Sequence, residues 1–100
     1  MPSRDSQYRL TPSARVDLEE VWDYTVATWS LTQAERYHEQ IIAAFEALAA
    51  APDRGLDVGD LRTGYLRWTV GMHFIFYRKA DYGIKIVRIL HQQRDIPRHL

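Results

Sequence analysis

The chain has 100 residues and a mass of 11.7 kDa, which allows one domain, because two separate hydrophobic cores would each be too small. Its 13 Lys and Arg balance its 13 Asp and Glu, and this zero net charge excludes a uniformly basic nucleic-acid-binding protein. The absence of cysteine excludes disulfides, thiolate catalysis and cysteine-based zinc sites. We therefore predict a single domain over residues 1–100 that depends on packing alone.

The charges and the apolar residues are unevenly spread along the chain. Residues 1–50 carry 4 basic and 8 acidic side chains, whereas residues 51–100 carry 9 basic and 5 acidic ones. The start of the chain is polar, and the longest apolar run is the five residues 41–45, where a membrane span needs about 20. We expect a soluble cytoplasmic protein with an acidic first half and a basic second half.

The first predicted elements are a short extended segment, Tyr8–Leu10, and a helix that begins near Pro12 with Thr11 as its N-cap. Apolar side chains then recur at helical spacing, at Leu18, Val21, Trp22, Thr25, Val26 and Trp29. Acidic residues occupy the first turns or the other side, at Asp17, Glu19, Glu20 and Asp23. We predict an amphipathic helix with an acidic outer face. Its two tryptophans belong by default to the core, and contact with a partner is the alternative.

A second helix is predicted to begin at Ser30–Thr32, where Ser30 with Gln33 and Thr32 with Glu35 are alternative capping boxes. Its apolar stripe is Ala34, Tyr37, Ile41, Ala44, Phe45 and Leu48. It must end at Ala51, because Pro52 cannot continue a helix. The short connection between the two helices predicts a helical hairpin.

Three strands are predicted after a loop from Pro52 to Gly64, at residues 65–70, 73–78 and 84–91. Strict alternation in the last strand places Ile84, Ile86 and Leu90 on one face and Val87 and Ile89 on the other. The fold class is therefore α+β, with an N-terminal strand and a helical hairpin packed on one face of a mainly antiparallel four-stranded sheet. The hairpin leaves the second apolar face for a partner, for the N-terminal segment or for the tail after Arg94.

The order of these elements resembles the ParE branch of the RelE/ParE toxin superfamily over nearly the whole chain. The resemblance is carried by residues 10–12 at the start of the first helix, by the stretches 17–24 and 34–37, and above all by the ending 87–95, an Ile/Val-rich strand with one Arg that closes in His-x-x-Arg-Asp. It implies the toxin of a type II toxin-antitoxin system, which inhibits DNA gyrase and replication and is not an enzyme.

The resemblance also implies a ParD-like antitoxin in a hetero-oligomeric complex, and we expect no cofactor, no membrane contact and no sequence-specific nucleic-acid binding. The basic second half suits an acidic partner segment or a DNA-bound target. The candidate target contacts are Arg67, Arg88, His91 and Arg94. The candidate antitoxin contacts are Tyr24, Trp29, Phe74 and Phe76.

The alternative within the superfamily is a RelE-like ribosome-dependent mRNA endonuclease, with Arg62, Arg67, Arg88, His91 and Arg94 as its available groups. Zero net charge and the lack of a tyrosine after Tyr82 disfavour it. A structural role competes at several positions: Arg88 can pair with an acid of the first helix, the residues from His91 to Asp95 can fix the tail, and His73 can be a satisfied core residue. The four histidines show no metal-ligand spacing, so no metal site is predicted.

Overall fold

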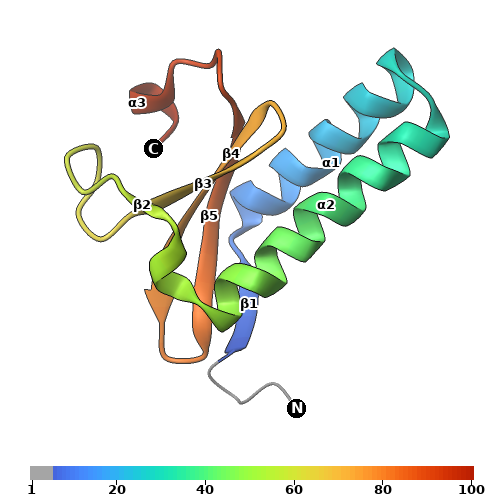
Figure 1. Ribbon diagram of the computed structural model, residues 1–100. Helices are drawn as coiled ribbons and strands as arrows, with labels where there is room; N and C mark the ends of the chain where they lie inside the picture. Colours follow the sequence, from blue (N-terminus) through green and yellow to red (C-terminus); the bar gives the residue numbers. More distant parts are fainter. Residues whose placement is uncertain (1–5) are drawn as a thin grey trace.

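The computed structural model describes residues 6–100, so the polar start of the sequence, residues 1–5, lies outside the described residues. The elements, in order, are β1 (Gln7–Leu10), α1 (Pro12–Thr28), α2 (Leu31–Ala50), a 3-10 turn η2 (Pro52–Arg54), β2 (Leu56–Asp57), β3 (Leu66–Val70), β4 (His73–Ala80), β5 (Gly83–His91) and α3 (Ile96–His99). Figure 1 shows the α1–α2 hairpin lying across one side of the sheet. The predicted α+β class is confirmed.

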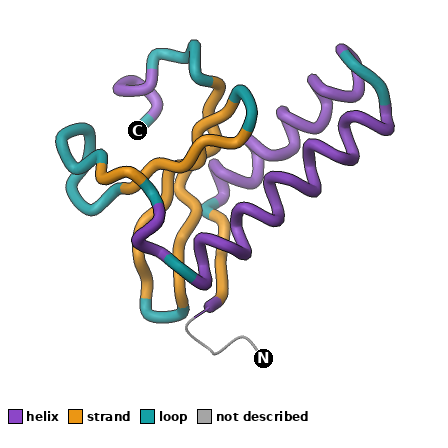
Figure 2. Tube along the Cα trace, viewed as in Figure 1, coloured by secondary structure: helices purple, strands orange, loops and turns teal. Residues whose placement is uncertain are grey.

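Over residues 6–100 the sheet has five strands in the order β1-β5-β4-β3-β2, not the predicted four. The additional strand, β2, lies in the segment predicted as a loop and pairs with β3 through two residues only. The pairing of β1 with β5 is parallel and every other pairing is antiparallel. The first and last strands of the chain therefore lie side by side (Figure 2).

Both helices begin where the sequence predicts. The Thr11 side chain accepts from Ala14 N, and Ser30 accepts from Gln33 N, which selects the first of the two capping boxes. The second helix buries the predicted stripe at Ala34, Tyr37, Ile41, Phe45 and Leu48, together with Ala49, whereas Ala44 is only partly buried. The first helix instead buries Ala14, Asp17, Val21 and Thr25.

The buried stripe of α1 differs from the predicted one at its two ends. Asp17, predicted on the acidic outer face, is only 6% exposed. Trp29, predicted by default in the core, is 39% exposed, and Trp22 is partly buried against His38. Trp29 is exposed because the far end of the hairpin extends past the sheet (Figure 1), whereas Asp17 is buried because it binds Arg88 of β5.

The sheet face that packs against the hairpin, the helix-covered face, carries the main core. Phe45 and Ile41 of α2 lie on Ile75, Tyr77, Ile84 and Ile86 of the central strands, and all six are fully buried. Tyr77 also donates to Pro52 O and accepts from Gly55 N, which fixes the turn after α2 to the sheet. Burial of a side chain of this size stabilises a fold by roughly 1.5–3 kcal/mol.

A β-bulge at Val87 changes which residues of β5 face the hairpin. Ile86 pairs with Tyr77 and Arg88 pairs with Phe76, so Val87 has no partner on β4. Beyond the bulge the alternation is reversed: Ile89 joins the core under the helices, and Leu90 joins the opposite cluster. The predicted grouping of Leu90 with Ile84 and Ile86 is therefore wrong, since an inserted residue shifts a two-residue repeat by one.

The opposite face, the tail-covered face, carries a smaller cluster. Val58, Phe76 and Leu90 are buried there, and Ile96 and Leu100 of the C-terminal tail, residues 92–100, pack against them. This is the tail-covering alternative of the sequence prediction. No helix within residues 6–100 is both long and apolar enough to span a membrane.

Candidate functional site

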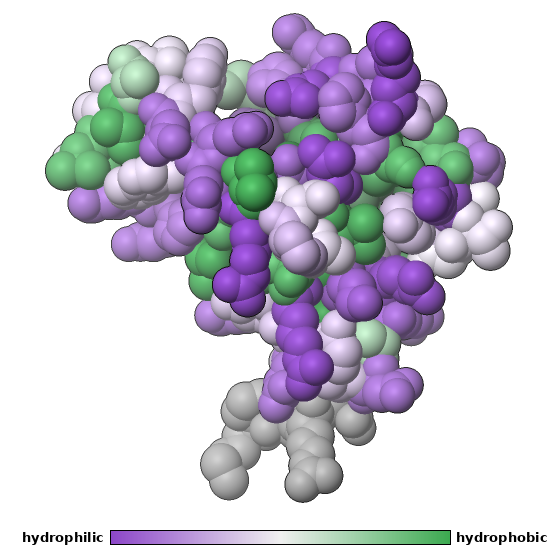
Figure 3. All heavy atoms as spheres, turned by 180° about the vertical axis from the view of Figure 1, so that it is seen from behind, coloured by the Kyte–Doolittle hydropathy of each residue, from purple (hydrophilic) through white to green (hydrophobic). Residues whose placement is uncertain are grey.

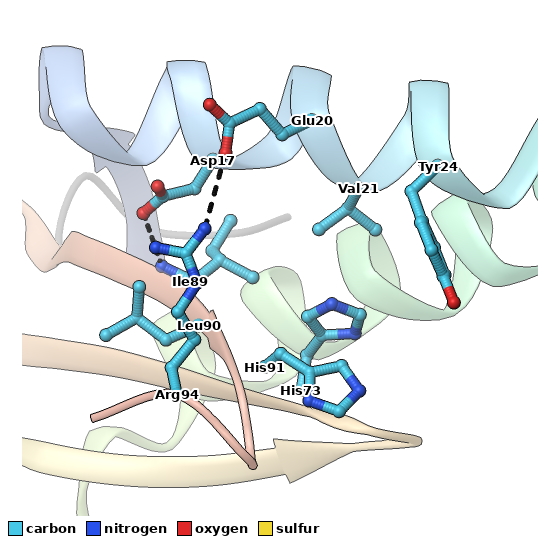
Figure 4. Close-up of a pocket in the computed structure, with 9 residues that line it drawn as sticks. All are labelled: Asp17, Glu20, Val21, Tyr24, His73, Ile89, Leu90, His91 and Arg94. Carbon is cyan, nitrogen blue, oxygen red and sulfur yellow. Dashed lines mark hydrogen bonds and ion pairs between the residues drawn. The ribbon is translucent and has the colours of Figure 1, made fainter. Parts of the chain in front are cut away.

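A pocket of about 300 Å³ opens between α1 and the ends of β4 and β5. Figure 4 shows its lining: Asp17, Glu20, Val21, Tyr24, His73, Ile89, Leu90, His91 and Arg94. We call it the histidine pocket, because two histidine rings lie next to each other in it with centroids 5.3 Å apart. It lies beyond the end of β1, where β5 is still paired with β4 but its other edge faces α1.

The edge of β5 beyond β1 is closed by groups from the start of α1. Thr11 Oγ1 donates to Val87 O, and Ile89 N donates to Asp17 Oδ2. The guanidinium of Arg88 forms a two-pronged ion pair with Asp17, through Nε to Oδ2 at 2.7 Å and Nη2 to Oδ1 at 2.9 Å. The hydrogen bonds to this carboxylate raise the pKa of Arg88 above its ordinary value, so the guanidinium stays charged.

Arg88 also ties the C-terminal tail to the sheet. Its Nη1 donates to His99 O at 2.9 Å, and Arg62 Nη1 donates to Leu100 O at 2.6 Å. His99 Nδ1 lies 2.8 Å from Asp95 O, and its Nε2 lies 3.1 Å from Arg94 Nη1. The structural role predicted as one alternative for Arg88, pairing with an acid of the first helix, is confirmed.

His73 forms the floor of the pocket and belongs to a hydrogen-bonded group with Tyr37. Tyr37 OH donates to Val70 O at 2.8 Å and lies 2.6 Å from His73 Nδ1. A tight turn allows this approach: Gly71 has φ 54°, and a Cβ there would lie 2.6 Å from the Tyr37 ring. Burial lowers the pKa of His73 to about 4, with a smaller effect of His91 in the same direction, and burial raises the pKa of Tyr37.

His91 and Arg94 form the outer side of the pocket. His91 Nδ1 accepts from Gln93 N at 3.1 Å, which holds the ring against the turn that follows β5. Arg94 Nη2 lies 4.0 Å from the Glu20 carboxylate, and both side chains are about half exposed or more, so this ion pair contributes little to stability. The pocket thus combines a buried neutral histidine, a more accessible histidine and a loose ion pair at its rim.

Sequence comparison identifies the family. The family described as "ParE toxin of type II toxin-antitoxin system, parDE" matches residues 8–96. The chain belongs to the ParE toxin family. It is 41% identical over 96 residues to Toxin ParE1 of Mycobacterium tuberculosis, covering 95% of this chain and 98% of that protein. It is 37% identical over 93 residues to Toxin ParE1 of Caulobacter vibrioides, covering 93% and 96%.

A solved structure shares the fold of this ParE-family chain. The structure titled "Chromosomal ParDE TA system from P. aeruginosa" aligns with a TM-score of 0.73 and 19% identity, covering 89% of this chain and 98% of that one. The predicted resemblance to the ParE branch is therefore confirmed by family, by relatives and by fold.

The predicted target contacts of this ParE-family chain do not form one cluster. His91 and Arg94 lie together in the histidine pocket, and Arg88 lies beside it but is bound to Asp17. Arg67, in contrast, lies on β3, where its guanidinium stacks over the Phe74 ring at 4.3 Å. The tail-covered face and the pocket are thus two separate locations for these cations.

The predicted antitoxin contacts also divide into two groups. Tyr24 and Trp29 are 55% and 39% exposed on α1 and available to a partner. Phe74 is half-buried, and Phe76 is only 1% exposed beneath the C-terminal tail. Phe76 is therefore not a surface residue, because the tail and Val58 cover the part of the sheet that was predicted to be open.

Sequence reasoning missed two residues that build the site. Asp17 was assigned to an exposed acidic face, although an Arg in an apolar strand requires a nearby carboxylate and Asp17 lies three residues before Glu20 on the pocket side. His73 was predicted as a satisfied core or interface histidine, which its bond to Tyr37 supports, but not as part of a pocket. The predicted strands 73–78 and 84–91 contained a signal, because antiparallel pairing across their short loop sets His73 opposite position 90, and the bulge shifts its partner to His91.

Proposed function

We propose that this chain is a cytoplasmic growth-inhibiting toxin that acts on DNA gyrase, blocks replication without catalysing a reaction, and is neutralised by a ParD-like antitoxin. The observation that carries the proposal is the ParE family match over residues 8–96, which assigns the chain to the toxins of type II toxin-antitoxin systems.

Exposed apolar side chains support a protein partner on the hairpin. Val26, Trp29 and Leu31, near the point where α1 passes into α2, are 37%, 39% and 56% exposed. Figure 3 shows apolar atoms gathered at this far end of the hairpin, beside polar ones. Tryptophan residues such as Trp29 are enriched at binding hot spots. An antitoxin segment with apolar side chains would remove this surface from water.

The charge distribution supports a separate contact with a DNA-bound target. Residues 62–100 contain eight Lys or Arg but only two acids, Asp81 and Asp95. A surface of this sign speeds association with polyanionic assemblies. The acidic residues, in contrast, gather on α1 and α2.

The geometry of Arg88 weighs against the nuclease alternative. An RNA-cleaving site needs a cation free to approach the scissile phosphate together with an acid-base pair. The guanidinium of Arg88 is instead occupied by Asp17 on one side and by His99 O on the other. A phosphate would have to break a buried ion pair to reach it, which costs roughly 3–5 kcal/mol.

The test is a supercoiling assay with purified toxin, DNA gyrase and relaxed plasmid. At micromolar toxin we expect loss of supercoiling and accumulation of cleaved plasmid, both prevented by prior addition of the antitoxin from the adjacent reading frame. Arg94→Ala should weaken the inhibition, whereas Arg78→Ala, an exposed cation on β4, serves as the matched control. Full supercoiling at micromolar toxin would contradict the gyrase target. Message cleavage in a translation extract would contradict the non-enzymatic role.

A further inference from the structure

His73 presents an unused hydrogen-bond acceptor to the histidine pocket. Val70 O can only accept, so the single proton of Tyr37 OH goes to it, and the 2.6 Å contact with His73 then requires a proton on His73 Nδ1. The neutral ring therefore carries a lone pair on Nε2. This atom has no hydrogen-bond partner among the described residues. Every fully buried side-chain nitrogen in that part of the chain has a partner, so Nε2 is not fully buried. It is therefore reached through the pocket that the ring lines. The rest of the side chain is closed off, at 6% exposure.

His91 presents the complementary group. Its Nδ1 accepts from Gln93 N, so the proton of the neutral ring is on Nε2, which is the nitrogen left to donate to a ligand. The two rings are nearly perpendicular, at 83°, with centroids 5.3 Å apart. Both rings line the same pocket, so a group bound there lies beside both of them. Val21 and Ile89 supply the apolar wall beside it (Figure 4).

The pocket selects against charged ligands. An anion would meet the lone pair of His73, which stays neutral because burial lowers its pKa to about 4. A cation would meet the His91 N–H, and at the rim the opposite charges of Arg94 and Glu20 lie 4.0 Å apart and offset each other. A neutral group with one N–H and one carbonyl satisfies both rings, and the primary carboxamide is the protein side chain with this pattern.

We propose that the histidine pocket receives an Asn or Gln side chain of a partner protein, whose amide N–H donates to His73 Nε2 and whose carbonyl accepts from His91 Nε2. This inference rests on the proposed function, because the antitoxin and the target are the partner proteins that it concerns. A polypeptide fits better than a nucleic acid because the charges around the pocket are compensated. Asp17 is bound to Arg88, and Glu20 lies 4.0 Å from Arg94, so the pocket offers no unpaired positive charge to a phosphate.

The first test measures the binding of small ligands to the pocket in the absence of any partner protein. Toxin labelled with 15N-histidine is titrated with acetamide, acetate, guanidinium and adenine, and the ring nitrogen resonances are followed by NMR. Before titration we expect the lone pair of His73 on Nε2 and that of His91 on Nδ1. Acetamide at millimolar concentration, the range expected for a four-heavy-atom ligand, should shift both Nε2 resonances together. Acetate and guanidinium should leave them unchanged.

Three outcomes would overturn the proposal: no shift with acetamide, equal shifts with acetate or guanidinium, or a stronger response to adenine, which would indicate a nucleobase site. Because this titration uses the toxin alone, it separates the chemistry of the pocket from the gyrase and antitoxin claims. A toxin that fails to inhibit gyrase can still bind acetamide here, and an inhibitory toxin can fail to do so.

The second test uses three single substitutions that retain an aromatic ring. His91→Phe removes the donor and leaves the Tyr37–His73 bond in place, whereas His73→Phe removes the acceptor. His38→Phe, on α2 against Trp22, is the matched control outside the pocket. Loss of one hydrogen bond to a partner should weaken antitoxin or gyrase binding about tenfold for the first two, and leave the control unchanged. Wild-type affinity of His91→Phe for both partners would contradict the proposal, and this variant decides the question if His73→Phe fails to fold.

Discussion

The two faces of the sheet are covered in different ways. The helix-covered face lies under two long helices. Its central side chains have no exposed surface, and neither does Phe45, which packs on them: Ile75, Tyr77, Ile84 and Ile86. The tail-covered face lies under a four-residue helix and a loop, and its cluster includes side chains, such as Phe74, that are only half-buried. Apolar packing holds the first face. The second depends in addition on hydrogen bonds from Arg62 and Arg88 to two carbonyls of the tail.

Because of this difference, the helix-covered face provides most of the stability, and the tail-covered face is the one that opens more easily. Unfolding the helix-covered face requires separating elements that are far apart in the sequence, whereas the tail is joined to the sheet by a few contacts near the chain end. Segments with few buried contacts open at lower free energy than the core. We expect the tail-covered face to open locally while the rest of the fold stays intact.

The largest expected difference between the faces is in the free energy of unfolding that is lost when one phenylalanine on each face is truncated. Phe45→Ala removes a fully buried ring and should lower the free energy of unfolding by about 4 kcal/mol. Phe74→Ala removes a half-buried ring that stacks with Arg67 and should cost about 1–2 kcal/mol. Urea denaturation followed by circular dichroism measures both. Equal losses would contradict the division between a firmly and a weakly packed face.

A somewhat smaller effect is expected at the ion pair that connects the two faces. Asp17→Asn leaves the mostly buried Arg88 guanidinium without its countercharge and should cost about 3 kcal/mol. The tail should also loosen, since Arg88 holds His99 O, and faster hydrogen exchange of the tail amides in native conditions would report it. The control is Glu20→Gln, which removes an acid one turn further along α1 from an exposed ion pair. Its free energy of unfolding should stay within about 0.5 kcal/mol of the wild-type value. A loss for Asp17→Asn no larger than this control would refute the structural role of the pair.

The smallest expected effect is a pH dependence specific to the helix-covered face. In the folded chain His73 has a pKa of about 4, below its ordinary value of 6.5, so the unfolded chain binds more protons between these pH values. Stability that is present above pH 6.5 is therefore lost as the pH falls towards 4, by roughly 2–3 kcal/mol at pH 4.5. Thermal unfolding across this range measures the loss. It should be reduced in His73→Phe and retained in His38→Phe, and an unchanged slope in the first variant would exclude His73 as its source.

Much of the fold follows from local sequence signals. The N-caps at Thr11 and Ser30, the stop at Pro52 and the three main strands all lie where capping chemistry and periodicity predict them. The two-residue strand β2 could not be predicted, because two residues cannot establish an alternation. The bulge was hidden for another reason: Val87 is apolar, so the sequence continues to look like an uninterrupted strand.

The candidate site was predicted only in part, because it depends on contacts between distant segments. His91 and Arg94 were recognised from the family resemblance, and both line the pocket. Trp29 was assigned by default to the core because helical periodicity contains no information on where the underlying sheet ends. Asp17 was assigned to the surface because polar residues are normally exposed, and only the position of Arg88 across the sheet edge explains its burial.

The pairing of the first strand with the last has a consequence for synthesis on the ribosome. Strand β1, Gln7–Leu10, pairs with Gly83–Ile86 of β5. Asp17 binds Arg88 and Ile89, which lie more than 70 positions later in the chain. Contacts that span nearly the whole chain form late, and a polypeptide is made from its N-terminus onward. A nascent chain that stops before residue 83 therefore lacks the strand on which both its first strand and its buried acid depend. We expect a chain that ends there not to fold, because β1 and Asp17 then lack their partners on β5.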